Sequence, residues 1–287
     1  MARKDRNAGL DPDTDYEQIN RNVGLYDFPW DGMQALGLAL FRTYAVPSIG
    51  RLLHETGEFE TATQKRHDDT GLLLEIPGEK GLDSFDGRAA VRRINQMHHL
   101  YKISNDDMRY VLSTFVVVPI RWIEAYGWRR LTDGEVRAGV RYYQELGRRM
   151  GIKEIPQTYA EFAEFMDDYE VENFGFDQGG RQVADATLDL LASFYPLIPN
   201  RMMKHFSRCL MDRPLLDAFG YEVPSASSRW LARQSLVLRG KFVAMLPARK
   251  RPKYLRDRRR VRSYPHGFDL ADLGSRAVHD VISRKSA

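Results

Sequence analysis

Apolar residues recur three and four positions apart along most of this chain, and no stretch alternates apolar and polar residues for long. The first pattern is typical of helices with one buried face, whereas the second would mark strands. Proline and glycine interrupt the apolar runs, so the predicted helices are separate segments. They cover residues 30–41, 44–53, 59–76, 84–101, 108–126, 180–194, 199–212 and 228–246, with two more beginning after Thr132 and Thr158. The sequence therefore predicts an all-α fold, a single globular multi-helix bundle.

Hydroxyl residues stand where several predicted helices begin, namely at Ser84, Ser104, Thr132 and Thr158. A side-chain oxygen at this position can accept a hydrogen bond from a backbone N–H of the first turn. Glu135 and Glu161 each follow a threonine by three residues and can return that bond, and Asp107 forms a looser version of the same pattern. These capping patterns favour helical architecture.

Prolines predict where two helices are disturbed. We expect Pro77 and Gly78 to end the helix over residues 59–76, because proline lacks a backbone N–H and its ring crowds the preceding turn. For the same reason we expect Pro119 to kink the helix over residues 108–126.

Composition is that of an ordinary soluble globular protein, with 43% hydrophobic and 29% charged residues in a chain of 287. The single cysteine, Cys209, excludes a disulfide framework and a thiolate metal cluster. The chain also lacks the H-E-x-x-H, G-x-S-x-G, Walker and G-x-G-x-x-G motifs. Zinc peptidases, α/β hydrolases, P-loop enzymes and Rossmann dehydrogenases are therefore excluded.

The two ends of the chain differ from the middle. We divide the sequence into a polar lead-in (1–28), a helical domain (29–248) and a basic C-terminal tail (249–287). The lead-in lacks the apolar core of a signal peptide, and no uncharged run exceeds eleven residues, so we expect a cytoplasmic protein without a membrane-spanning helix. Residues 249–262 hold nine Lys/Arg and one acid, which makes them the candidate for peripheral contact with an anionic membrane. Few aromatic residues interleave them, so we expect no nucleic-acid partner.

A histidine is the first candidate for chemistry. Val91, Ile94, His98 and Tyr101 recur at spacings of three and four residues, so one apolar stripe directs a ring nitrogen toward the interior. Such a nitrogen is either a metal or haem ligand or a hydrogen-bonded core histidine. His99 points about 100° further round the helix and is expected to be exposed or to support the ligand from outside its first contacts.

Two residues on the preceding helix could face this histidine. Arg66 and Thr70 are four residues apart and therefore share a helix face. An inward arginine needs an anion, which a haem propionate, a bound oxygen or a buried carboxylate would supply. The neighbouring His67, Asp68 and Asp69 are predicted to form an exposed charged cluster, and the acidic residues 161–172 a solvated helix face.

The order and spacing of these motifs resemble the MpaB branch of the MpaB/rubber oxygenase family, formerly DUF2236. The resemblance covers residues 41–246 and is carried by residues 65–70, 94–98, 103–115, 119–123 and 211–220. It implies a helical fold around a b-type haem whose iron uses dioxygen to attack carbon–carbon double bonds of an apolar, isoprenoid-like substrate. It also implies a haem pocket between the central helices.

The resemblance also assigns roles to residues. The proximal histidine of rubber oxygenases lies in a Met-His-Ala motif that Met97 and His98 resemble, so His98 is the expected iron ligand. The distal arginine and threonine look like Arg66 and Thr70, which would contact the haem or bound oxygen. The expected apolar wall includes Leu112 and Phe115, together with Leu73 and Val111, and Glu58 is a candidate general base.

Two positions depart from the rubber oxygenase pattern. Asp69 replaces the lysine before the distal threonine, and Asn95 replaces the arginine three residues before the histidine. The sequence thus predicts a haem-dependent oxygenase. The alternative is a non-catalytic helical protein that binds a hydrophobic ligand or a membrane surface. The oligomeric state is not predicted.

Overall fold

The structure is a computed structural model, and it describes residues 5–257 and 261–275. These residues form α-helices and no β-strand, which confirms the predicted all-α fold. A short π-helical turn, Val23–Asp27, follows α1, and a 3₁₀ turn, Leu270–Asp272, lies near the C-terminus. The α-helices are α1 (Tyr16–Asn22), α2 (Pro29–Thr43), α3 (Pro47–Glu55), α4 (Glu58–Thr61), α5 (Thr63–Lys80), α6 (Phe85–His98), α7 (Asn105–Tyr126), α8 (Asp133–Arg149), α9 (Tyr159–Asn173), α10 (Gln178–Ser193), α11 (Asn200–Leu210), α12 (Arg213–Ala218) and α13 (Ala226–Met245).

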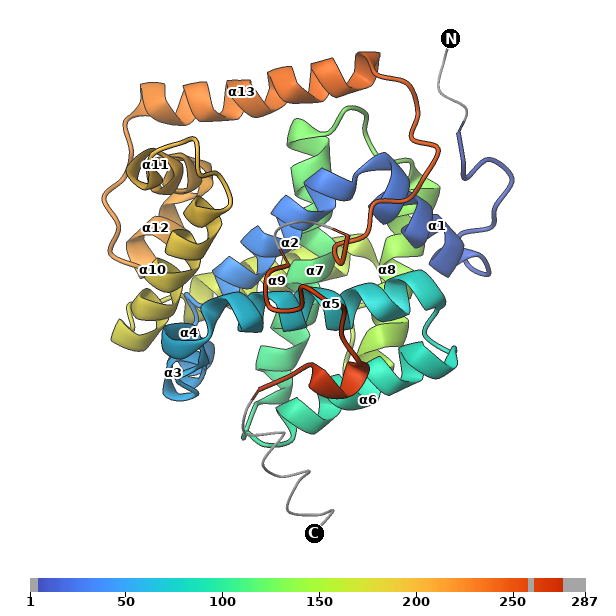
Figure 1. Cartoon of the computed structure of the whole chain (residues 1–287), viewed down its shortest axis with the longest axis horizontal. Coiled ribbons are helices and arrows are strands. Elements are labelled where there is room, and N and C mark those ends of the chain that lie inside the picture. The colour runs from blue at the N-terminus through green and yellow to red at the C-terminus, as the bar shows by residue number, and fades with distance from the viewer. Residues whose placement is uncertain (1–4, 258–260, 276–287) are drawn as a thin grey trace.

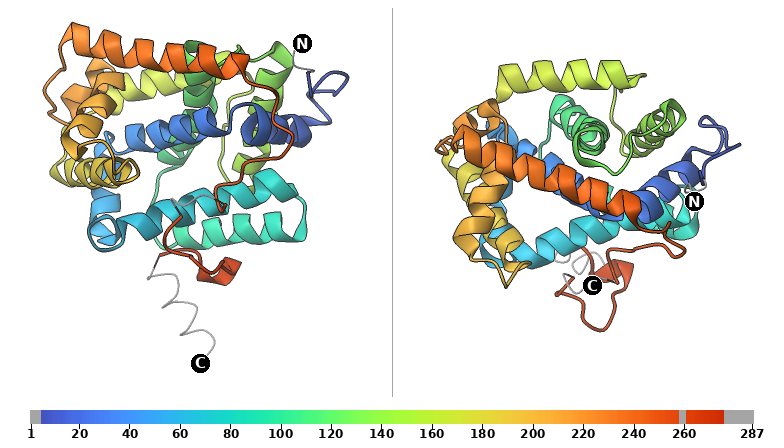
Figure 2. Two further views of the ribbon diagram at one scale, coloured as in Figure 1. Left: turned by 45° about the horizontal axis from the view of Figure 1, so that its top comes forward. Right: turned by 90° about the horizontal axis from the view of Figure 1, so that it is seen from above.

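The centre of the molecule is the contact between α2 and α7 (Figure 1). The helix α7 is packed on its other sides by α8 and α9, so Tyr110, Val117 and Phe162 are fully buried there. The helices α5 and α6 lie antiparallel along one side of this centre, and α10, α11 and α12 close one end (Figure 1). The helix α13 crosses the opposite side from α6 (Figures 1 and 2). Among the described helices, none is long and apolar enough to cross a bilayer.

The predicted helix caps are present. Ser84 accepts a hydrogen bond from the Gly87 N–H at 2.9 Å, and Ser104, Thr132 and Thr158 each accept one from the residue three positions on. At the start of α8 the Glu135 side chain also accepts from the Thr132 N–H at 2.9 Å, which completes a capping box. The local sequence therefore determines where α6 to α9 begin.

Pro77 does not end α5, contrary to the prediction. The helix runs through it to Lys80, and the Pro77 carbonyl still accepts the Gly81 N–H at 3.0 Å. A proline removes only one backbone hydrogen bond of the helix, and here the Pro77 side chain is buried, so packing retains the helical turn. The helix ends at Gly81, whose φ of +95° is a left-handed conformation that favours glycine. The helix α7 likewise continues through Pro119.

Residues 261–275, here called the return segment, fold back over α5 and α6 (Figure 1). Asp68 accepts the backbone N–H groups of Arg262 and Ser263, both at 3.1 Å. Asp69 accepts the Tyr264 hydroxyl and, at 3.1 Å, the Gly274 N–H. The predicted exposed charged cluster is therefore wrong for these two acids, which are 0% and 3% exposed. The return segment covers them and supplies the donors that compensate their charges.

A buried ion pair joins α2 to α9 and α12. Arg42 donates from Nε to Glu170 Oε1 at 2.7 Å and from Nη1 to Asp212 Oδ2 at 2.5 Å. Tyr110 donates to the same Glu170 oxygen at 3.0 Å. Glu170 is 7% exposed, so it departs from the solvated face predicted for residues 161–172. The reason is that both partners of Glu170, Arg42 and Tyr110, lie far from it in sequence.

Candidate functional site

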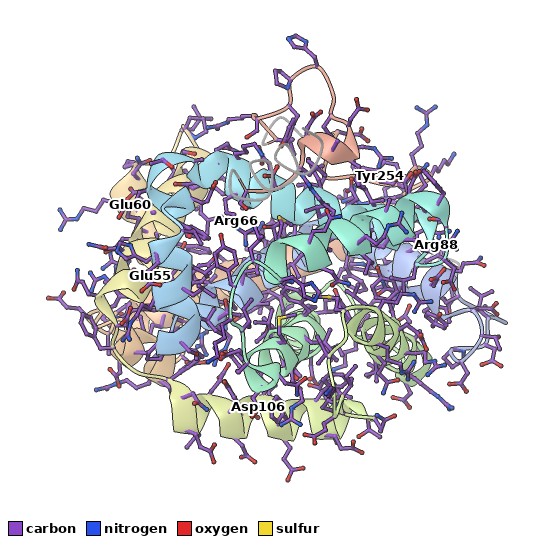
Figure 3. The ribbon with its side chains drawn as sticks, turned by 90° about the horizontal axis from the view of Figure 1, so that it is seen from below. Glu55, Glu60, Arg66, Arg88, Asp106 and Tyr254 are labelled. Atoms are coloured by element: carbon purple, nitrogen blue, oxygen red, sulfur yellow. The ribbon has the colours of Figure 1, made fainter. Side chains whose placement is uncertain are left out.

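The candidate site lies where the first turns of α5 approach the last turn of α6. Arg66 and Thr70 come from α5, and His98 is the last residue of α6. Figure 3 shows Arg66 on α5, with Glu55 and Glu60 of α3 and α4 on one side and α6 on the other. The antiparallel packing of α5 and α6 is what brings residues near positions 66 and 98 together.

His98 is held as a neutral ring. Burial, and then the positive charges of Arg66 and His99, lower the pKa of His98 to about 4. Its Nδ1 is shielded from solvent and has no hydrogen-bond partner in the described structure, although the residue as a whole is only partly buried. A buried ring nitrogen without a partner is costly unless a ligand uses the ring. A ligand that uses the His98 ring would relieve this cost.

Arg66 is positioned by its own helix. Its Nη1 donates to Thr70 Oγ1, and the Thr70 hydroxyl donates to the Arg66 backbone carbonyl at 2.8 Å. The guanidinium also lies 5.9 Å from the centre of the Phe59 ring. Among the described residues no carboxylate forms an ion pair with Arg66.

Aromatic residues border this guanidinium, and sequence reasoning missed them. Tyr44 is buried, and burial raises the pKa of its hydroxyl while the nearby Arg66 charge opposes that rise. The Tyr44 and Phe59 rings meet edge to face at 5.6 Å. Glu58, the candidate base, is 8% exposed at the start of α4. No local sequence pattern identifies Tyr44 as a neighbour of Arg66, because the end of α2 and α5 come together only through tertiary packing.

The residues of the predicted apolar wall have contacts in two clusters. Leu112 packs against Gly147 of α8, where an added Cβ would lie 2.6 Å from its Cδ2 atom. The Phe115 ring lies 6.2 Å from that of Tyr143, also on α8. Leu73 belongs to the cluster between α5, α6 and the return segment. The structure thus brings Arg66, Thr70 and His98 together, and the contacts of Leu112 and Phe115 described here are core contacts with α8.

Both departures from the rubber oxygenase pattern have structural roles. Asp69 binds the return segment and forms an ion pair with Lys65 at 2.7 Å. Asn95 donates to the Arg149 carbonyl at 2.9 Å and so ties α6 to the end of α8. His99 is exposed, as predicted, and its Nδ1 lies 2.7 Å from the Asn95 carbonyl oxygen.

A metal ion bound by protein groups alone would need several converging ligands. Within residues 5–257 and 261–275, no three His, Cys, Asp or Glu side chains converge in this way. The donor set at His98 is a single imidazole with a cation nearby. That set suits a metal already held by an anionic macrocycle, because the macrocycle supplies the other ligands and the negative charge.

Two cavities lie away from His98. An open cleft of about 710 Å³ borders the Arg42 ion pair, between α9 and α12. A smaller apolar cavity of about 90 Å³ lies between α2, α5, α10 and α11. His67 lines the smaller one, with its ring 5.5 Å from that of Phe194.

Comparison with known proteins gives consistent matches. The family model described as "ER-bound oxygenase mpaB/B'/Rubber oxygenase, catalytic domain" matches residues 31–242. The chain is 31% identical over 256 residues to an ER-bound oxygenase mpaB' of Penicillium brevicompactum, covering 83% of this chain and 60% of that protein. It is 30% identical over 222 residues to an ER-bound oxygenase mpaB of Penicillium roqueforti, covering 71% of this chain and 74% of that protein.

The chain thus spans about 60% of the length of the first of these relatives. The matched region contains most of α2, all of α3 to α12 and most of α13, and therefore Arg66, Thr70 and His98. The return segment lies beyond it. By the extent of this match, the chain belongs to the family of the mpaB and rubber oxygenase catalytic domains.

Proposed function

We propose that this protein is a haem-dependent oxygenase that uses dioxygen to oxidise carbon–carbon double bonds of an apolar, isoprenoid-like substrate. The family supports an oxygenase. The neutral His98, with a buried ring nitrogen that lacks a partner, supports a haem b ligand. The relatives are named ER-bound, and a location at a membrane is part of this proposal.

The residues present fit a haem. His98 would hold the iron, because imidazole binds metals in its neutral form and the depressed pKa keeps the ring neutral at physiological pH. Bound haem would supply the capacity to bind and activate dioxygen.

Arg66 would bind an anionic group of the cofactor or stabilise negative charge that develops beside it. Its guanidinium is already oriented by Thr70, so little side-chain entropy is lost when the anion binds. The buried Tyr44 and Phe59 rings limit water around that charge, which strengthens its interactions.

One observation carries the proposal, namely the unpartnered, neutral His98 beside a guanidinium that has no carboxylate partner among the described residues. The test is the absorption spectrum of the purified protein. We expect a Soret band that His98→Ala abolishes while the helical circular dichroism is retained. His99→Ala is the matched control, because its ring is adjacent but exposed.

A wild-type protein without a Soret band after reconstitution with haem would contradict the proposal. So would a band that persists in His98→Ala. Absence of the band in the wild type favours the alternative, a non-catalytic protein that binds a hydrophobic ligand. A band that persists in His98→Ala makes His99 or His67 the candidate ligand instead. Oxygen consumption with unsaturated isoprenoids and lipids would then separate a catalyst from a binding protein.

A further inference from the structure

The outer face of α13 is the largest run of exposed apolar side chains along one helix. It consists of residues that are 57–76% exposed, namely Trp230, Leu231, Leu238, Phe242 and Met245. At 100° per residue these five positions fall within about 120° of one another, so they form a single stripe. An amphipathic surface helix normally turns such a stripe toward the core, and here it is turned away.

The inner face of α13 explains why the helix is fixed in this orientation. Ala232, Leu236 and Gly240 are buried against the molecule. A Cβ on Gly240 would lie 2.6 Å from the Tyr126 carbonyl oxygen, so only glycine allows this approach. Arg239 also points inward, where it pairs with Asp31 at 2.6 Å. The view from above in Figure 2 shows α13 lying across the molecule with no described element over it.

The charged residues of α13 and of the segment that follows it are all basic. From Ser225 to Arg256 the sequence holds nine Lys/Arg and no Asp/Glu. Lys241 lies within the stripe, and Lys250, Arg251 and Lys253 are exposed just beyond the end of α13. A Lys stem can lie along apolar groups while its ammonium stays in water.

We propose that the outer face of α13, with Lys250, Arg251 and Lys253, lies on the surface of an anionic phospholipid bilayer. Trp, Phe and Leu on one face of a helix that also carries lysine are the composition of helices that lie in the headgroup layer. Tryptophan is enriched at that depth. A protein partner is less suitable, because the cores of protein interfaces are depleted in lysine. The inference rests on the membrane location included in the proposed function, and it is independent of haem binding.

The proposed membrane contact includes only part of the basic run, residues 249–262, that the sequence suggested for this role. Arg256 is bound to Glu79, and the Arg262 guanidinium donates to the Ser193 carbonyl at 3.1 Å. Arg258, Arg259 and Arg260 lie outside the described residues. Of the basic run, residues 249–253 are the part adjacent to the end of α13.

The test is vesicle flotation with the full chain. We expect binding to phosphatidylcholine vesicles with about 30% phosphatidylserine, weaker binding to pure phosphatidylcholine, and a decrease between about 0.1 M and about 1 M salt. Leu238→Gln with Phe242→Gln removes apolar contact, and Lys250→Glu with Arg251→Glu reverses charge. Each pair should weaken partitioning by about tenfold or more.

Phe85→Gln is the matched control, because Phe85 is 77% exposed on α6, away from α13. It should bind vesicles as the wild type does. Circular dichroism establishes that each variant is folded. The proposal is overturned if the wild type ignores anionic vesicles, or if Phe85→Gln lowers binding as much as the α13 variants. It is also overturned if light scattering shows a dimer that the α13 variants convert to a monomer, since the face would then join two copies.

Discussion

The His98 imidazole on α6 lies within the electrostatic influence of the Arg66 guanidinium on α5, and burial together with that charge lowers the pKa of His98 to about 4. The ordinary value is about 6.5, so the fold holds the ring neutral where a free histidine would gain a proton. This relationship gives a site for a neutral nitrogen ligand. It also makes stability depend on pH.

Between pH 6.5 and pH 4 the unfolded chain binds a proton at position 98 that the folded chain does not bind. Stability therefore falls as pH falls through this window, by about 2 kcal/mol between pH 7 and pH 5 for the ligand-free protein. The free energy of unfolding can be measured with urea at pH 7 and pH 5. Its decrease between the two pH values should be smaller in His98→Gln than in the wild type. The same loss in His98→Gln as in the wild type would contradict this assignment, and His99→Gln serves as the control.

Arg66→Met should raise the pKa of His98, because it removes a nearby positive charge. An NMR titration of the ring protons would measure the change. The same variant should bind haem more weakly if the guanidinium contacts an anionic group of the cofactor. Thr70→Val removes the acceptor that orients Arg66. It should weaken haem binding less than Arg66→Met does, by about 1 kcal/mol. Equal haem affinity in all three proteins would exclude Arg66 from the site.

Asp69→Ala should loosen the return segment. The substitution removes the acceptor of the Gly274 N–H and one of the acceptors of the Tyr264 hydroxyl and of the Lys65 ammonium. We expect a loss of about 2–4 kcal/mol and rapid proteolysis within residues 261–275. Asp257→Ala, at an exposed position, is the control. If the segment resists protease in both variants, the anchoring role is refuted.

Arg42→Met should destabilise the protein by about 3–5 kcal/mol, because it leaves the buried Glu170 carboxylate without its cation. Urea unfolding measures the loss. Arg51→Met breaks an exposed pair with Asp177 and should change stability little. The double variant Arg42→Met, Glu170→Met should recover part of the lost stability, and a double variant as unstable as the single one would argue against an uncompensated charge as the cause.

Gly50 and Gly180 allow α3 and α10 to approach closely. A Cβ on Gly50 would lie 2.4 Å from the Tyr44 carbonyl oxygen and 2.7 Å from the Gly180 Cα. Gly50→Ala should therefore cost about 2 kcal/mol or more. Gly139 on α8 has open space around its Cβ position, so Gly139→Ala should stabilise by up to about 1 kcal/mol. The midpoint temperature of thermal unfolding should fall in Gly50→Ala and rise in Gly139→Ala.

Local sequence was sufficient to predict most helices and the caps at Ser84, Ser104, Thr132 and Thr158. These features depend on residues within one turn of each other, which periodicity and capping rules describe. The end of α5 was misjudged, since neighbouring helices retain a helical turn at Pro77 that the isolated segment would lose.

The predictions that Asp68, Asp69 and Glu170 are exposed are wrong for a common reason. Each acid is compensated by groups more than a hundred residues away, so its own neighbours in sequence suggest exposure. The spatial proximity of Arg66 and His98 was anticipated from helix faces and from the family resemblance. The aromatic residues around Arg66 were not anticipated, because Tyr44 lies near it only through the packing of α2 on the rest of the bundle.

The return segment lies beyond residue 242, where the family match ends, yet its backbone compensates two buried carboxylates on the helix that carries Arg66 and Thr70. A recombinant fragment designed to stop at the boundary of the match would expose Asp68 and Asp69 and weaken that helix. Fragments intended for crystallisation or assay should therefore extend at least to residue 275.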